Sequence, residues 1–319
     1  MHEYKLNTPV TLIVFNRPDT TLKVFEEIAK VKPPKLLVIS DGARKNCPDD
    51  FDKVTLTRSI IDRVNWDCEV LTNFSDTNLG CKNRVSSGID WVFQQVEESI
   101  ILEDDCLPHQ SFFPFCEELL DRYRHDQRIS MIGGTNHLFG YRNTNDSYYY
   151  SKTTPIWGWA TWRDRWEDSY DVDMKSWPLI KDMGLVDDMV RNKLEAKEFV
   201  QNFDRLYQGE VDTWDAQWTF ACLLHGRLSI VPNVNLISNI GFHENATHTI
   251  DPLSSLSMME INEIKFPLKH PLGFIESHSL DVRVSRNQSY KEPFWKRTIV
   301  RFTQPYLFQR IKKKLLRLL

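Results

Sequence analysis

The chain has 319 residues, of which 41 % are hydrophobic and 26 % charged, the composition of a globular protein with a buried core. Residues 291–319 carry a net charge of +8 within a total of −4, so the remaining residues carry −12. An acidic body argues against a nucleic-acid binder and leaves only the basic end suited to an anionic surface. The six cysteines form no C-x-x-C motif, and no signal peptide or membrane span is evident. We therefore expect a cytoplasmic protein with reduced thiols.

Strands and helices are expected to alternate in the first third of the chain. Apolar runs predict strands at 10–15, 35–40, 68–73 and 99–102, and amphipathic patterns predict helices at about 20–31, 50–64 and 81–96. This alternation is typical of a Rossmann-like α/β fold, in which ligands bind outside the carboxyl ends of parallel strands. Asn16, Asp41 and the acidic run 103–105 each follow a predicted strand. The sequence therefore predicts a site at this edge of the sheet.

The pattern is less regular after Pro108. Helices are expected at about 111–124, 186–207 and 214–225, with short strands at 129–134 and 228–232. We expect one catalytic domain over 1–249, an irregular linker over 250–290 and a basic tail over 291–319. Within that tail, residues 304–319 can form an amphipathic helix with basic and apolar faces. Such a helix suits either the surface of an anionic membrane or docking on the body.

The stretch "SIILEDDCLP" places three carboxylates directly after a buried-looking strand. Glu103 and Asp105 face one way along an extended segment and Asp104 the other. The chain lacks both G-x-G-x-x-G and the P-loop motif, so a bound nucleotide needs another counter-charge for its phosphates. A divalent cation, Mn²⁺ or Mg²⁺, held by a carboxylate and substrate phosphates would supply it. The alternative interpretation is a solvated acidic turn that caps the next helix.

Several segments, taken in order, resemble the N-acetylglucosaminyltransferase I family. They are "VFNRPDTTLKVFEEI", "ISDG", "NLGCKNRVSSGIDWVF", "IILEDDCLPHQSFFPFCEELL", "PIWGWATWRDRW" and "TWDAQW", and the resemblance covers about residues 8–250. Members of that family are inverting glycosyltransferases of the GT-A fold that use UDP-GlcNAc and Mn²⁺. The resemblance therefore implies a GT-A type, mostly parallel sheet flanked by helices, with a UDP-sugar as donor.

The resemblance also implies roles for the residues near the donor. Asp105 would be the metal ligand, while Glu103 and Asp104 would contact sugar and ribose. Asp41 would hydrogen-bond the uracil, and Arg17 would approach the nucleotide.

Two further positions follow from the same resemblance. Either Asn83 or Arg84 would lie near the diphosphate, and the sequence does not choose between them. Asp215 would be the general base that accepts a proton from the acceptor hydroxyl. The alternative for Asp215 is an acidic residue in the first turn of a helix, favoured there by the helix dipole, with Thr213 as the N-cap.

Aromatic and histidine residues offer weaker candidates. The four tryptophans from Trp157 to Trp166 mostly follow helical spacing, which predicts core packing, but Trp157 or Trp159 could stack on a sugar. Gly158 between them would allow the backbone to approach a ligand closely. His243, in "HENATH", is a candidate metal ligand on a loop, although a solvated loop histidine is the commoner case.

The sequence thus predicts a cytoplasmic, metal-dependent, inverting glycosyltransferase. The donor would be a UDP-sugar, carrying GlcNAc or a related hexose, and the acceptor a hydroxyl of a glycan or of a lipid-linked saccharide. Peripheral membrane association through residues 304–319 would suit a lipid-linked acceptor. The alternatives are a nucleotidyltransferase acting on sugar phosphates, a glycoside hydrolase with a carboxylate pair, and a lectin-like binder without turnover.

Overall fold

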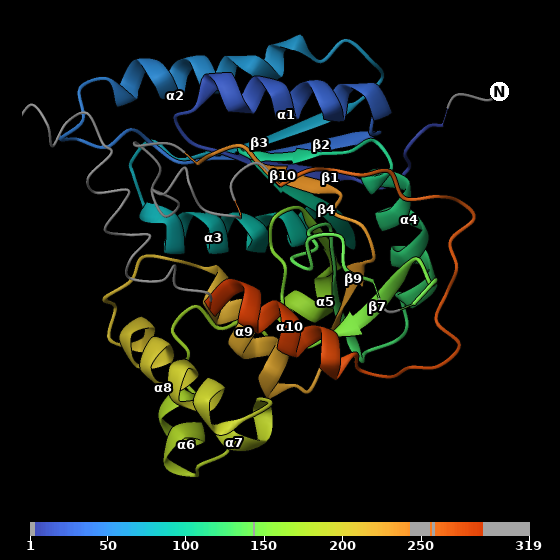
Figure 1. Cartoon of the computed structure of the whole chain (residues 1–319). Coiled ribbons are helices and arrows are strands. Elements are labelled where there is room, and N and C mark those ends of the chain that lie inside the picture. The colour runs from blue at the N-terminus through green and yellow to red at the C-terminus, as the bar shows by residue number, and fades with distance from the viewer. Residues whose placement is uncertain (1–3, 143, 243–255, 257–258, 290–319) are drawn as a thin grey trace, which may run out of the picture.

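An eight-stranded sheet with strand order β3-β2-β1-β4-β8-β6-β9-β7 runs through the molecule (Figure 1). The computed structural model describes residues 4–142, 144–242, 256 and 259–289. The strands of the sheet are β1 (Val10–Val14), β2 (Lys35–Ser40), β3 (Glu69–Phe74), β4 (Glu98–Glu103), β6 (Ile129–Gly133), β7 (Tyr148–Ser151), β8 (Trp159–Trp162) and β9 (Leu228–Pro232). A separate two-stranded ribbon pairs β5 (Cys106–Pro108) with β10 (Ile237–Asn239).

The first four strands are all parallel, and β7 and β8 run opposite to the other strands of the sheet. Every residue of β1 is buried, as expected for a central parallel strand that is covered on both faces. Figure 1 shows α1 (Pro18–Val31) and α2 (Asp50–Ser59) over one face and α3 (Gly80–Gln95) over the other. The predicted Rossmann-like, mostly parallel sheet flanked by helices is confirmed.

Two apolar clusters fill the two faces of the sheet. One lies beneath α1 and α4 (Phe112–Tyr123), and the other beneath α3 and α9 (Asp215–Leu224). The remaining helices are α5 (Arg163–Glu167), α6 (Trp177–Asp182), α7 (Val186–Met189), α8 (Lys193–Tyr207) and α10 (His278–Ser289). The single helix expected over 186–207 is two helices, because Asn192 accepts hydrogen bonds from the backbone N–H groups of Leu194 and Glu195 and so caps α8.

The tryptophan spacing indicated a helix, but Trp159 and Trp162 lie in strand β8. Residues three apart in a strand point to opposite faces of the sheet. Trp159 is 1 % exposed and packs against Trp166, Trp214 and Trp218 on the face of α3 and α9. Trp162 packs on the other face and donates its indole N–H to the carbonyl of Leu120. Both tryptophans therefore belong to the core.

The segment expected to be an irregular linker packs on the body where the structure describes it. Ile264 and Leu268 are buried in the cluster beneath α1 and α4. Helix α10 lies against β7, and its Asp281, which is 0 % exposed, accepts hydrogen bonds from the Ser151 hydroxyl and the Lys152 backbone N–H. Residues 259–289 are thus part of the fold. The predicted tail, residues 304–319, lies outside the described residues, and within them no helix has the length and hydropathy to cross a membrane.

Gly158→Ala is expected to destabilise the fold by about 2–4 kcal/mol. Gly158 has a φ of 63°, and an added Cβ would lie 2.5 Å from Cδ1 of Ile237. The close approach predicted at this glycine is therefore to a core side chain. Gly184→Ala is the matched control, because Gly184 has a φ of 69° but no atom within 4 Å of an added Cβ. Urea unfolding should show the larger loss for Gly158→Ala, and equal losses would contradict the packing argument.

Candidate functional site

The carboxyl ends of β1 and β4 bring the first loop against the acidic run. Ile13 of β1 is in register with Glu103 of β4, so the chain segments that follow these strands are neighbours. The backbone N–H of Phe15 donates a hydrogen bond to Oδ2 of Asp104 at 3.2 Å. The loop after β1 therefore contacts the acidic run, whereas the side-chain amide of Asn16 in that loop donates to Asp50 at 2.8 Å.

Arg17 is the counter-charge of the acidic run. Its Nη1 lies 2.6 Å from Oδ2 of Asp105 and 3.5 Å from Oδ1 of Asp104, and both carboxylates are buried. Burial raises the pKa of Asp104, and Arg17 opposes that rise. Burial, followed by the charges of Asp105 and Asp104, raises the pKa of Glu103. One arginine thus faces three carboxylates, which leaves the cluster short of positive charge.

Asp215 joins this cluster from the other half of the chain. It is the first residue of α9, and its charge also contributes to the raised pKa of Glu103. Its Oδ1 accepts hydrogen bonds from the Thr213 hydroxyl and from the backbone N–H of Ala216 at 2.9 Å. These bonds fix the carboxylate at the start of the helix. Asp215 is therefore close enough to the end of β4 for its charge to act on Glu103.

Asp212, three residues before Asp215, forms hydrogen bonds with the start of helix α3. Its carboxylate accepts the backbone N–H groups of Cys81 at 2.9 Å and Lys82 at 2.8 Å, at the start of α3. These are helix N–H groups that have no partner within the helix. Asp212 therefore caps α3 across the molecule, and it ties that helix to the loop that leads to Asp215.

Asp212→Ala is expected to cost about 0.5–2 kcal/mol of stability, the usual effect of removing a helix cap. Thermal or urea unfolding measures it. Asp67→Ala serves as the control, because Asp67 is exposed and none of the described residues bonds to its carboxylate. The cap assignment fails if both variants are equally stable.

Asp41 uses both carboxylate oxygens within the protein. It accepts the backbone N–H groups of Gly42 at 2.9 Å, Leu79 at 2.9 Å and Gly80 at 3.1 Å, and the side-chain amide of Asn78 at 3.0 Å. Asp41 thereby joins the end of β2 to the start of α3. Burial raises the pKa of Asp41, and these backbone donors lower it. A contact from Asp41 to a uracil stays a prediction from the resemblance.

The structure distinguishes the two candidates for a diphosphate contact. Arg84 is 5 % exposed and donates to the backbone carbonyl of Asn73 at 2.7 Å and to its side-chain oxygen at 2.5 Å. Its charge is therefore used inside the protein, beside β3. Asn83 is exposed on the first turn of α3, so it is the candidate that a ligand can reach.

Of the aromatic candidates, Trp157 is the one with accessible surface. It is half-buried and packs edge-on against His137 and Phe242, with ring centroids 5.7 and 5.8 Å apart. Trp159 is part of the core, which favours the packing interpretation of that residue over contact with a sugar.

The donor set fits a cation shared with a substrate better than a metal held by protein alone. Within the described residues, no group of three or more His, Cys, Asp or Glu side chains is arranged to hold a metal. Asp105 with one neighbouring carboxylate matches the one or two protein ligands that Mg²⁺ commonly takes beside phosphates. An added Cβ on Gly241 would lie 2.2 Å from Oδ2 of Asp105, so the backbone closes one side of that carboxylate. His243 lies outside the described residues.

No protein-family model and no curated protein matches this chain. Among solved structures it is similar to 4-diphosphocytidyl-2C-methyl-D-erythritol synthase from Anaerococcus prevotii, with a TM-score of 0.30 and 9 % identity, over 69 % of this chain and 99 % of that one. It is also similar to a UDP-glucose pyrophosphorylase complexed with UDP-glucose, with a TM-score of 0.25 and 9 % identity, over 46 % of this chain and 64 % of that one. The fold assignment above rests on the strand order and pairing of the sheet itself.

Proposed function

We propose that this chain is a metal-dependent transferase that uses a UDP-sugar and moves the sugar to a hydroxyl of a glycan or lipid-linked saccharide. One observation carries the proposal. Glu103, Asp104 and Asp105 lie near Arg17 at the carboxyl edge of a parallel sheet, and the charge of Asp215 acts on Glu103. Ligands of open α/β sheets bind at that edge, and three carboxylates with one arginine between them favour the binding of a further cation.

On the donor side, Asp105 would hold Mn²⁺ or Mg²⁺ together with the diphosphate. The cation would neutralise the charge that develops on the departing UDP. Arg17, 20 % exposed in its side chain, would bind phosphate oxygens once the cation shares its carboxylates. Glu103 and Asp104 would then accept hydrogen bonds from sugar and ribose hydroxyls, and Asn83 would approach the diphosphate.

On the acceptor side, Asp215 would take the proton of the attacking hydroxyl. Its carboxylate is held in place at the start of α9, and its charge acts on Glu103 at the end of β4, near which the anomeric carbon of a bound donor would lie. Attack from that side, in line with the departing UDP, inverts the anomeric configuration. Trp157 would contribute an aromatic surface for a sugar ring.

A nucleotidyltransferase acting on sugar phosphates is the second candidate. The names of the two solved structures above belong nearer to that class, and their TM-scores do not decide between the two functions. Against it, the loop after β1 reads "FNRPDTT" and has no glycine for a phosphate-binding turn. A lectin-like binder would need no Asp215, and a glycoside hydrolase would need no nucleotide.

Two measurements test the proposal. A thermal-shift screen of UDP-sugars, with and without Mn²⁺, should show stabilisation that depends on the metal. Product analysis then separates the candidates, because sugar transfer releases UDP, whereas nucleotidyl transfer consumes UTP and a sugar phosphate and releases pyrophosphate. The proposal is refuted if no UDP-sugar stabilises the protein in the presence of Mn²⁺.

The membrane prediction has a separate test. The full chain should co-sediment with anionic liposomes, and deletion of residues 304–319 should abolish this binding.

A further inference from the structure

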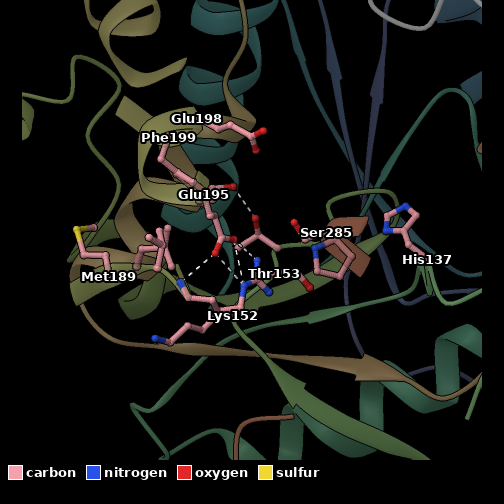
Figure 2. A pocket seen from close by; sticks show the side chains of 14 residues that line it. His137, Lys152, Thr153, Met189, Glu195, Glu198, Phe199 and Ser285 are labelled. Atoms are coloured by element: carbon pink, nitrogen blue, oxygen red, sulfur yellow. Dashed lines mark hydrogen bonds and ion pairs between the residues drawn. The ribbon is translucent and has the colours of Figure 1, made fainter. Parts of the chain in front are cut away.

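A cavity of about 320 Å³ lies apart from the carboxylates of the candidate site (Figure 2). It is enclosed by α8, α9, α10 and the segment 152–155 that follows β7. Its volume is within the range of small-molecule sites in proteins. Figure 2 shows Met189 and His137 on opposite sides of the lining side chains, with Thr153 and Ser285 between them.

The walls combine hydroxyl groups, a carboxylate and an aromatic ring. Glu198 is exposed toward the cavity, and no described residue bonds to its carboxylate. Phe199 follows it and offers an apolar surface, while Thr153 and Ser285 contribute hydroxyls. Carboxylates and hydroxyls can form hydrogen bonds with the hydroxyl groups of a sugar, and an aromatic ring can pack against its apolar face. This combination of side chains therefore suits a sugar.

A group of ion-paired side chains lies along one wall of the cavity. Arg191 pairs with Glu195 and lies 3.5 Å from the buried Asp281. The Arg191 side chain is 9 % exposed, and its Nη1 makes no hydrogen bond with the described residues. Nη1 is buried and faces Asp281, so this ion-paired group joins α8 to α10 beside the cavity and holds the wall in place.

Helix α9 connects this cavity to the candidate base. The Thr219 hydroxyl donates to the backbone carbonyl of Asp215 at 3.3 Å, one helical turn away on the same face. The Thr154 hydroxyl is hydrogen-bonded to that of Thr219, so Thr154 is the donor between them. The oxygen of Thr154 is therefore left to accept a hydrogen bond from a ligand.

A chain of aromatic residues leads from the same cavity to Asp105. His137, which lines the cavity, packs against Trp157, and Trp157 packs against Phe242. Phe242 follows Gly241, whose backbone lies against the Asp105 carboxylate. Packed side chains thus connect the cavity with the backbone behind Asp105, and α9 connects it with the backbone of Asp215.

We infer that this cavity binds the acceptor of the proposed transfer, a saccharide that lies between α8 and α9 with its reacting hydroxyl directed toward Asp215. The role of the bound saccharide as acceptor rests on the proposed function, but the binding of a saccharide in the cavity can be tested separately. Glu198 and Thr154 form hydrogen bonds with the sugar hydroxyls, and Phe199 packs against the ring.

The test uses saturation-transfer NMR on the full chain with methyl glycosides of glucose, galactose, mannose and N-acetylglucosamine. Glu198→Ala and Thr154→Val each remove groups that bond the sugar and should weaken binding about tenfold or more. Glu26→Ala is the matched control, because Glu26 is an exposed glutamate on α1, far from the cavity in sequence and on the other face of the sheet. This variant should bind the glycosides as the unchanged chain does.

Calorimetric binding of UDP with Mn²⁺, measured on the same variants, separates the two proposals. Lost glycoside binding with unchanged UDP binding supports the inference. Unchanged glycoside binding in both variants, or no saturation transfer from any of the four glycosides, overturns it and leaves the proposed function standing. If the chain binds glycosides through Glu198 but binds no UDP, the saccharide site is supported and the proposed function is refuted.

Discussion

Asp105→Ala is expected to abolish transfer and the Mn²⁺-dependent part of the affinity for UDP while the fold survives. The carboxylate is 7 % exposed and pairs with Arg17 at 2.6 Å, so its removal deletes the proposed metal ligand. Loss of one preorganised electrostatic contact to a departing group typically slows a reaction by about 10²–10³-fold. Arg17 keeps Asp104 as a partner at 3.5 Å, which limits the cost to stability.

Isothermal calorimetry with UDP, with and without Mn²⁺, measures this effect, and circular dichroism checks the fold. Glu26→Ala again provides a control in which a carboxylate is lost from a remote exposed position. If UDP binds the Asp105→Ala variant with unchanged affinity in the presence of Mn²⁺, Asp105 is not the metal ligand.

Asp215→Asn is expected to lower turnover by about 10²–10⁴-fold, the usual contribution of a general base, with donor binding nearly intact. An asparagine keeps one side-chain oxygen to accept from Thr213 and Ala216, so the start of α9 should hold its shape. The amide cannot take the proton of the acceptor hydroxyl. The defect should therefore appear in kcat far more than in the affinity for UDP.

Asp212→Asn is the control nearest in sequence and chemistry. Asp212 caps α3 and has no place in the proposed proton transfer, so this variant should lose some stability and little turnover. If Asp212→Asn lost turnover while Asp215→Asn stayed active, Asp212 and not Asp215 would be the base. Retention of the anomeric configuration, observed by NMR of the product, would refute the inverting mechanism.

The elements that position the site were predictable because central parallel strands are buried on both faces. Such strands have continuous apolar runs, as in "LIV" of β1 and "IIL" of β4, and polar residues follow them in the sequence. Glu103, Asp104 and Asp105 could therefore be placed at one edge before any coordinates. Asp215 could be placed there only through the resemblance, because its approach to Glu103 depends on the packing of α9.

The features that could not be predicted from the sequence depend on contacts between residues far apart in the chain, or on residue spacing that fits both a helix and a strand. The bond from Cys81 to Asp212 spans 131 residues, and no local pattern signals it. Trp159 and Trp162 fit helical spacing, yet a strand of four residues carries both of them. Pro252, Pro267 and Pro271 indicated a linker over 250–290, but Ile264 and Leu268 are buried through contacts with residues far away in the chain, which no local pattern signals.

The glycine behind Asp105 restricts how this site can vary among related proteins. Gly241 has an ordinary backbone conformation, so space alone excludes other side chains: an added Cβ would fall 2.2 Å from Oδ2 of Asp105. A homologue that retains an aspartate at position 105 should therefore retain glycine at position 241, about 135 residues later in the chain. A homologue with a larger residue at 241 should also differ at 105. Covariation of these two positions in an alignment would show that the carboxylate and its backbone wall evolve as a unit.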